Sequence, residues 1–156
     1  MSRLEVPIKG RTLRATGDVL LWIELDLLLK DASGSWQAQP FRVDTGAEMS
    51  TMSAHEAKLL GLPMPRHATP GAVHVQTGLT FRLGYLRFQI VGMDPTEYVI
   101  ACLFLGDPNI PPTSARSATL PRKLLQPFQL LDRLRFTLDK DPAAGSLHGM
   151  LIVEKR

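Results

Sequence analysis

The chain has 156 residues, 44% of them hydrophobic and 21% charged, and its formal net charge is +3. These values favour one soluble globular domain spanning residues 1–156. The most apolar stretch, residues 19–29, is too short to cross a bilayer and includes Glu24 and Asp26, so we expect no membrane partner. Lysines and arginines are scattered without interleaved aromatic residues, and we therefore expect no nucleic-acid partner.

Motifs for metal ions, cofactors and nucleophilic serine are not found in the sequence. The four histidines lack metal-ligand spacing, and there is no Gly-x-Ser-x-Gly and no glycine-rich phosphate loop, so we expect neither metal nor cofactor. The single cysteine, Cys102, lies in an apolar run, which predicts an inert core thiol. With no disulfide possible and no apolar leader at the N-terminus, the expected location is cytoplasmic.

Short alternating runs predict strands in the first third of the chain. Residues 19–30 alternate: one face has the apolar residues Ile23, Leu25, Leu27 and Leu29, and Glu24 and Asp26 lie on the other. Asp31-Ala32-Ser33-Gly34 then reads as a hairpin turn, and residues 36–43 return as a second strand.

One capping signal and one turn signal organise the middle of the chain. Ser53 followed by Glu56 forms a capping box, which predicts a helix over residues 54–60 that ends at Gly61. Residues 72–76 and 79–91 are strand-like around a turn at Thr77-Gly78. The apolar phase shifts near Gly84, which predicts a bulge or bend there.

The last third combines a buried strand, a long loop and a short helix. Residues 98–105 are continuously apolar and predict a strand buried on both faces, followed by a loop over residues 106–121. Pro127 opens a short helix, and strands follow at 134–138 and 150–153. The sum is a mainly antiparallel β fold with two short helices, closed or nearly closed like a small barrel.

The sequence Asp44-Thr45-Gly46-Ala47 directly follows the strand that ends at Val43. Peptide hydrolysis without a metal or nucleophile needs a base to activate water and an acid to protonate the substrate, and two carboxyls sharing one proton supply both. Thr45 can hydrogen-bond to its counterpart, and Gly46 lets backbone approach the carboxylate. Asp and Gly are also common turn residues, so the tripeptide alone is a weak signal.

The surrounding sequence strengthens that signal. Residues 41–50, Phe-Arg-Val-Asp-Thr-Gly-Ala-Glu-Met-Ser, resemble the active-site segment of the retropepsin-like aspartic peptidases, retroviral and bacterial. The resemblance continues through residues 50–62, where a short segment runs into a helix, and through residues 103–108 and 124–139.

The resemblance implies a retropepsin-like closed β-barrel with one or two short helices, and the activity of an aspartic endopeptidase on extended polypeptides. There is no second Asp-Thr/Ser-Gly, so the second carboxylate would be Asp44 of another subunit in a homodimer. Thr45, Gly46 and Ala47 would support the active-site loop. The flap would span residues 69–82 and contact the substrate through Gly71, Ala72, Val73, His74 and Val75.

Two departures from the family pattern leave alternatives open. Gln126 stands where the family carries glycine after two apolar residues, and its side chain either crowds the catalytic loop or faces solvent. The flap is the second departure, since Gly71 and Gly78 are its only glycines and the sequence does not locate its tip. The loop over residues 106–121 is also enlarged relative to the family. One alternative is therefore a retropepsin-fold dimer that binds extended peptides but hydrolyses them weakly or not at all. A second, a basic nucleic-acid-binding β-barrel, predicts salt-sensitive retention on DNA or RNA.

Overall fold

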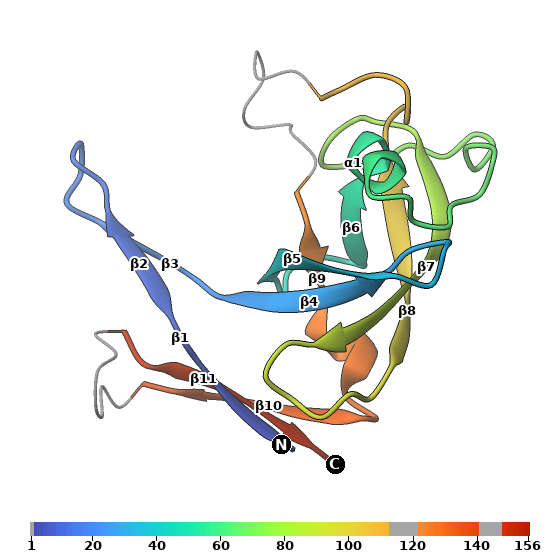
Figure 1. Ribbon diagram of the computed structural model, residues 1–156. Coiled ribbons are helices and arrows are strands. Elements are labelled where there is room, and N and C mark those ends of the chain that lie inside the picture. Colours follow the sequence, from blue (N-terminus) through green and yellow to red (C-terminus); the bar gives the residue numbers. More distant parts are fainter. Residues whose placement is uncertain (1, 113–121, 141–147) are drawn as a thin grey trace.

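The computed structural model describes residues 2–112, 122–140 and 148–156 (Figure 1). Within these residues the chain is mainly β. The elements in chain order are β1 Arg3–Pro7, β2 Lys9–Thr12, β3 Val19–Trp22, β4 Glu24–Lys30, β5 Trp36–Val43, β6 Ser50–Ser53, α1 Ala54–Leu59, β7 Phe81–Ile90, β8 Tyr98–Leu105, β9 Leu124–Leu125, the 3-10 helix η2 Pro127–Leu130, β10 Leu134–Asp139 and β11 Met150–Lys155. The greater part of the predicted loop, residues 113–121, lies outside the described residues.

Six strands close into a barrel in the order β4-β5-β9-β6-β8-β7 (Figure 1). β4 pairs antiparallel with β5 and β7, and β7 pairs antiparallel with β8. β9 pairs parallel with β5 and β6 pairs parallel with β8, so the barrel is less uniformly antiparallel than predicted. The predicted fold class, a mainly β closed barrel with two short helices, is confirmed.

The first predicted hairpin is confirmed in its turn, its second strand and its buried face, but the strand predicted over residues 19–30 is divided into β3, which pairs with β2, and β4, which pairs with β5. Asp31 Oδ1 accepts hydrogen bonds from the backbone N–H groups of Ser33 and Ser35, each at 2.9 Å, and this links β4 to β5. The core-facing leucines are at most 1% exposed: Leu25, Leu27 and Leu29. Burying a side chain of this size contributes about 1.5–3 kcal/mol, so this face fixes the register of β4 in the barrel.

The predicted bulge in β7 is wrong. The pairing of β7 with β8 runs without interruption from Phe81 opposite Leu105 to Phe88 opposite Tyr98. Gly84 is buried on the inward face, where an added Cβ would lie 2.8 Å from the ring of Phe104. The glycine is therefore required by close packing, and the apolar residues beside it are exposed outward.

The strand β8 has the predicted range but not the predicted burial. Its inward residues are buried, whereas Val99 on the other face is 48% exposed. Cys102 is fully buried in this strand, and its burial raises the pKa of the thiol, as expected of an inert core cysteine.

Both predicted helices form. The Ser53 hydroxyl accepts a hydrogen bond from the Glu56 backbone N–H at 3.3 Å, and α1 ends before Gly61, whose φ is +70°. Pro127 is at the start of η2, as predicted, although that helix is a single 3-10 turn. It places Leu130 in the core and directs the chain from β9 into β10.

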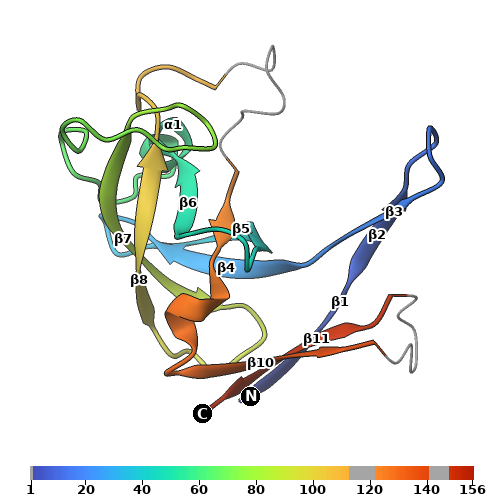
Figure 2. The ribbon, with the colours of Figure 1, turned by 180° about the vertical axis from the view of Figure 1, so that it is seen from behind.

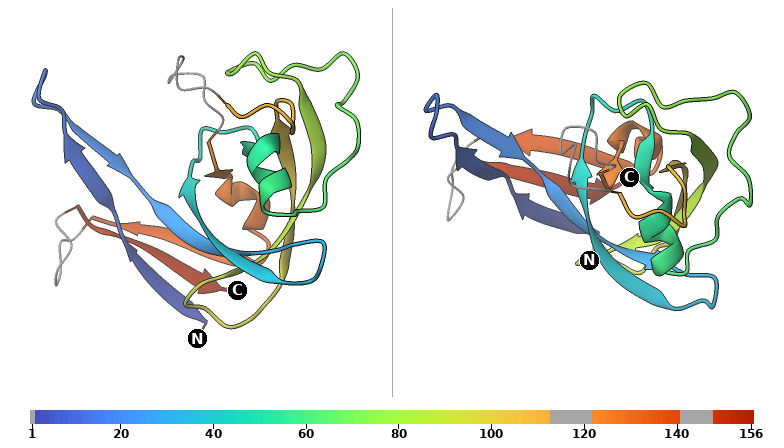
Figure 3. Two further views of the ribbon diagram at one scale, coloured as in Figure 1. Left: turned by 45° about the horizontal axis from the view of Figure 1, so that its top comes forward. Right: turned by 90° about the horizontal axis from the view of Figure 1, so that it is seen from above.

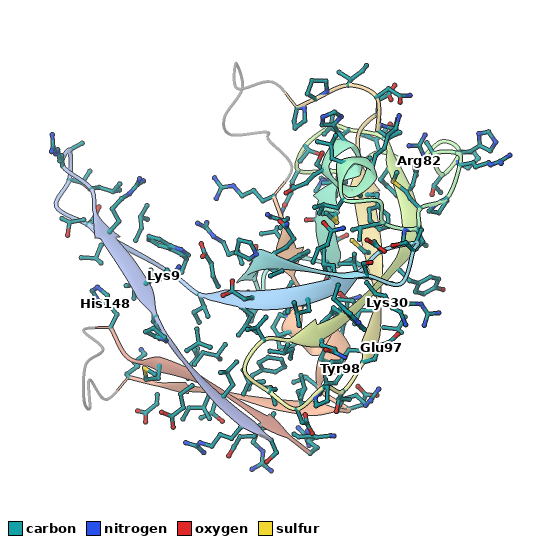
Figure 4. All side chains as sticks on the ribbon, viewed as in Figure 1. Lys9, Lys30, Arg82, Glu97, Tyr98 and His148 are labelled. Carbon is teal, nitrogen blue, oxygen red and sulfur yellow. The ribbon has the colours of Figure 1, made fainter. Side chains whose placement is uncertain are left out.

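Outside the barrel the structure has a second layer of strands, which includes the N-terminal residues and was not predicted from the sequence. β1, β11 and β10 form a three-stranded antiparallel sheet, and β2 and β3 form a hairpin that extends away from the barrel (Figures 1 and 2). Seen from above, this hairpin and the three-stranded sheet lie together on one side of the barrel (Figure 3). On the barrel itself, away from the hairpin of β2 and β3, Lys30 at the end of β4 forms an ion pair with Glu97 at 3.5 Å (Figure 4).

Candidate functional site

Asp44 lies at the end of β5, between two neighbouring segments of the barrel. Val43 is paired in parallel with Leu125 of β9, and the backbone N–H of Asp44 donates to the Leu125 carbonyl at 2.9 Å. On the other side, the Val43 backbone N–H donates to the Ile23 carbonyl, also at 2.9 Å. The backbone that carries the carboxylate is thus held from both sides, and the side chain is half-buried.

The loop after Asp44 folds back onto its carboxylate. The Gly46 backbone N–H donates to Asp44 Oδ1 at 2.8 Å, and a Cβ at position 46 would lie 3.3 Å from that oxygen. A larger residue would therefore push against the carboxylate, which accounts for the glycine. Ala47 is 8% exposed, whereas Thr45 is exposed and accessible to a second molecule.

Gln126 is buried beneath this loop, with only 5% of its surface exposed. Its Nε2 donates to the Thr45 carbonyl at 3.3 Å and also to the Ala47 carbonyl. Its Oε1 accepts from the Phe128 backbone N–H at 2.8 Å. The alternative in which the Gln126 side chain faces solvent is therefore wrong. The side chain lies against the active-site loop, and its amide donates hydrogen bonds to two carbonyls of that loop.

A cavity of about 210 Å³ opens at Asp44. It is lined by Arg42, Asp44, Thr51, His74, Gln76, Thr77, Leu105, Arg122 and Leu124. An adjoining cavity of about 170 Å³ shares Thr51, His74, Gln76 and Leu124 with it and extends along the active-site loop from Gly46 to Met49. Together they form a groove that runs past Asp44 between the barrel and residues 74–77.

The segment predicted as a flap forms the other wall of this groove. The His74 backbone N–H donates to the Leu79 carbonyl and the Gly78 backbone N–H donates to the His74 carbonyl, both at 2.8 Å. The predicted turn at Thr77-Gly78 is confirmed, with φ of +68° at Gly78. The expected strand over residues 72–76 is wrong, because the bonds close a tight turn there and only the bridge between Val73 and Thr80 remains.

The structure brings together some of the expected flap residues and not others. His74 and Val75 line the groove, whereas Gly71, Ala72 and Val73 line neither of its two cavities. Gln76 and Thr77 of the predicted flap also line the groove, although they were not named as substrate contacts. Its polar residues outside both the flap and the active-site loop, Arg42, Thr51 and Arg122, were not predicted as part of a site. Arg42 was detectable in the sequence, since it lies two residues before Asp44 on one strand and therefore on the same face.

Chemically, the larger cavity combines one half-buried carboxylate with two guanidinium groups and an imidazole, and the smaller cavity adds the carboxylate of Glu48. No cluster of three or more His, Cys, Asp or Glu side chains suited to a metal ion is found among the described residues. None of the described helices is long and apolar enough to span a membrane.

A comparison of the sequence with known protein families finds no match, and neither does a comparison with curated proteins. Among solved structures, a retropepsin-like aspartic protease from Rickettsia conorii matches 97% of this chain and 89% of its own, with a TM-score of 0.54. The fold is retropepsin-like. At 15% sequence identity the likeness establishes the retropepsin-like arrangement of strands, and the chemistry of the site has to be argued from the groove itself.

Proposed function

We propose that the chain is one subunit of a homodimeric aspartic endopeptidase whose catalytic dyad consists of Asp44 and Asp44 of the second subunit. The observation that carries the proposal is the setting of Asp44. Its carboxylate is half-buried, accepts the Gly46 N–H, and opens on a groove walled by the turn at residues 74–77. The retropepsin-like fold adds support for a hydrolase.

The chemistry of a carboxyl pair accounts for hydrolysis without a metal. The ionised carboxylate takes a proton from a water molecule, whose oxygen attacks the scissile carbonyl carbon, while the protonated carboxyl gives its proton to the carbonyl oxygen. The tetrahedral intermediate then breaks at its C–N bond as a proton passes to the nitrogen. The products are an amine and a carboxylic acid, and the pair again holds one proton.

The dimer is needed because the chain has a single Asp-Thr-Gly sequence. In an isologous dimer the same surface of each subunit meets at a two-fold axis, so one carboxylate per chain gives a pair. Thr45, which is exposed next to Asp44, is accessible to the second subunit and supports a contact between the two subunits at the two-fold axis. The proposal takes the whole chain as one catalytic domain acting in the cytoplasm.

The substrate is an extended polypeptide that lies along the groove. Extended chains bind in such grooves partly through backbone hydrogen bonds, as an added strand. The turn at residues 74–77 covers the groove and would open to admit the chain and then exclude water.

The substitution Asp44→Asn tests the proposal directly. It keeps the size of the side chain and removes both carboxyls of the dimer, so cleavage of unfolded proteins should fall at least about 10⁴-fold while the fold and dimer are preserved. Wild-type activity should be bell-shaped in pH, because the pair loses its base when fully protonated and its acid when fully ionised. The assay is cleavage of a mixed peptide library, with circular dichroism as the folding control.

Undiminished cleavage by purified Asp44→Asn protein would eliminate the mechanism. A well-formed dimer that binds extended peptides but cleaves none at any pH would favour the alternative of a peptide-binding module.

A further inference from the structure

Of the two cavities that make up the groove, the larger one, which opens at Asp44, carries more positive than negative charge, because Arg42 and Arg122 line it together with one carboxylate. Glu48 lines only the smaller cavity. Arg42 enters the larger cavity from β5, two residues before Asp44, and Arg122 enters it from the segment leading into β9. The two segments are joined, since the Arg42 backbone N–H donates to the Lys123 carbonyl at 2.9 Å. The Arg122 carbonyl in turn accepts from the Thr51 hydroxyl at 2.9 Å. Both arginines are therefore anchored through their backbones to the barrel wall of the cavity.

Among the described residues, neither guanidinium group is paired directly with a carboxylate, by an ion pair or by a side-chain hydrogen bond. The pKa of Glu24 is nevertheless lowered, mainly by its hydrogen bond with Lys9 and to a smaller extent by the charge of Arg42. Glu24, the cross-strand neighbour of Arg42, is held instead by Lys9 at 2.8 Å and by the Trp22 indole N–H at 3.1 Å. The guanidinium of Arg42 lies 5.6 Å from the centre of the Trp22 ring, which restricts its direction while leaving its N–H donors available.

The adjacent Lys123 provides a contrast. Its ammonium group is 3.1 Å from Glu56 and 2.8 Å from Gln39, so its charge is used in the fold. Among the described residues that line the cavity, Arg42 and Arg122 have guanidinium groups that no direct ion pair occupies, so both are available to an external partner. With a volume of about 210 Å³, the cavity is smaller than the roughly 300–1,000 Å³ typical of whole small-molecule sites. A single substrate side chain is a better match for it.

We propose that this cavity is a specificity subsite for an acidic side chain, so that the preferred substrates carry Glu or Asp next to the scissile bond. Arg42 and Arg122 are the specificity-determining residues, and the inference rests on the proposed peptidase function. A guanidinium binds a carboxylate through paired, charge-assisted hydrogen bonds. A neutral side chain would leave both groups desolvated and unpaired, and a basic one would add repulsion, so both are disfavoured.

The test separates binding from cleavage. Three extended peptides differ only in one central residue, Glu, Gln or Lys, and their affinities for the inert Asp44→Asn protein are measured by fluorescence anisotropy at low and high salt. The Glu peptide should bind about 10-fold to 100-fold more tightly than the Gln peptide, with the Lys peptide weakest and the difference reduced by salt. In wild type the same order should hold for kcat/KM.

Variants assign the preference to the arginines. Combining Arg42→Gln with Arg122→Gln should abolish the Glu preference, whereas the Lys versions keep the charge and should retain most of it. The control is Arg66→Gln, which removes one positive charge at an exposed residue that does not line the groove and matches each single arginine variant. Circular dichroism verifies the fold of each variant.

The outcomes distinguish this inference from the proposed function. Equal binding of the three peptides, no binding of any, or a Glu preference that survives loss of both arginines overturns the acidic subsite. A Glu preference in binding that depends on the arginines, without cleavage by wild type, supports the subsite and contradicts the peptidase function.

Discussion

Gln126 is the residue whose environment most clearly concerns the geometry of Asp44. Its amide donates to the carbonyls of Thr45 and Ala47 from below the loop, and its own backbone N–H donates to the Ser50 hydroxyl at 2.9 Å. Its backbone φ is −85°, so the position does not need a glycine. The side chain therefore acts as a positioning residue, which restrains the loop without touching the substrate.

The substitution Gln126→Gly should lower activity, because it leaves buried carbonyls of the loop without donors. We expect the free energy of unfolding to fall by about 1–3 kcal/mol. The value of kcat should fall on the order of 10-fold to 100-fold, since a displaced catalytic carboxylate is costly even at small shifts, whereas KM should change little. Chemical denaturation and steady-state kinetics measure the two effects.

The matched control is Gln89→Gly, which removes an amide bonded to the Pro95 carbonyl at an exposed place on β7. It should leave kcat unchanged even where it costs some stability. Higher activity in Gln126→Gly than in wild type would mean that the side chain crowds the loop, and would refute the positioning role.

At the scale of elements, the turn-bearing segment of residues 69–80 should behave as a mobile cover over a rigid barrel. Its regular pairing is limited to the Val73–Thr80 bridge, whereas β7 and β8 are paired along eight successive positions. Backbone amides with so few pairings open at low free energy. In the free protein, the amides of His74 and Gly78 should exchange at least about tenfold faster than those of β7.

A bound peptidomimetic inhibitor should slow exchange at His74 and Gly78 and leave β7 unchanged, which provides an internal reference. Hydrogen exchange followed by mass spectrometry measures both. Strong and equal protection of the segment with and without inhibitor would argue against a moving cover.

The elements that were predictable from the sequence are those with local signals. Alternation identified β4 and β5, and the Ser53–Glu56 capping pair identified α1. β9 has only two residues, and its pairing with β5 joins positions far apart in the sequence, so no local pattern reveals it. β1 pairs with β11 at the other end of the chain, and β2 is a four-residue, exposed strand without an apolar alternation, so no local pattern reveals either strand.

The same distinction applies to the candidate site. Asp44 to Ala47 could be proposed from a contiguous motif, whereas the role of Gln126 depends on carbonyls about 80 residues earlier. To predict the pair of groove arginines, two facts would have been needed. Arg42 could be placed on the face of Asp44 from its position in the strand, but the position of Arg122 in the same cavity depends on tertiary structure. Sequence patterns thus located the candidate carboxylate, whereas tertiary contacts determine which residues surround it.

At the scale of the whole molecule, the hairpin of β2 and β3 provides an apolar surface next to the Asp44 strand. A cavity of about 490 Å³ lies between this hairpin, β5 and the end of the three-stranded sheet, lined in part by Leu21, Trp22, Val43 and His148. Figure 4 shows His148 beside the hairpin. Val19, Leu20 and Leu21 are 49%, 46% and 56% exposed. Exposed apolar residues grouped in this way mark interaction surfaces, and Val43 makes this one continuous with Asp44.

We therefore expect dimerisation to depend on this hairpin. In an isologous dimer, the substitution Leu21→Ser removes two leucines from the interface, and the dissociation constant should rise about 100-fold. Activity per subunit of wild type should fall on dilution, and in Leu21→Ser this fall should begin at a correspondingly higher concentration.

The control is Leu59→Ser on α1. This leucine is even more exposed, at 73%, but lies on a different element, so its substitution should leave the dissociation constant unchanged. Sedimentation equilibrium across a concentration series measures the association. A wild-type chain that is strictly monomeric yet fully active would rule out a dyad shared between subunits, and a Leu21→Ser protein that associates as tightly as wild type would move the interface away from the hairpin.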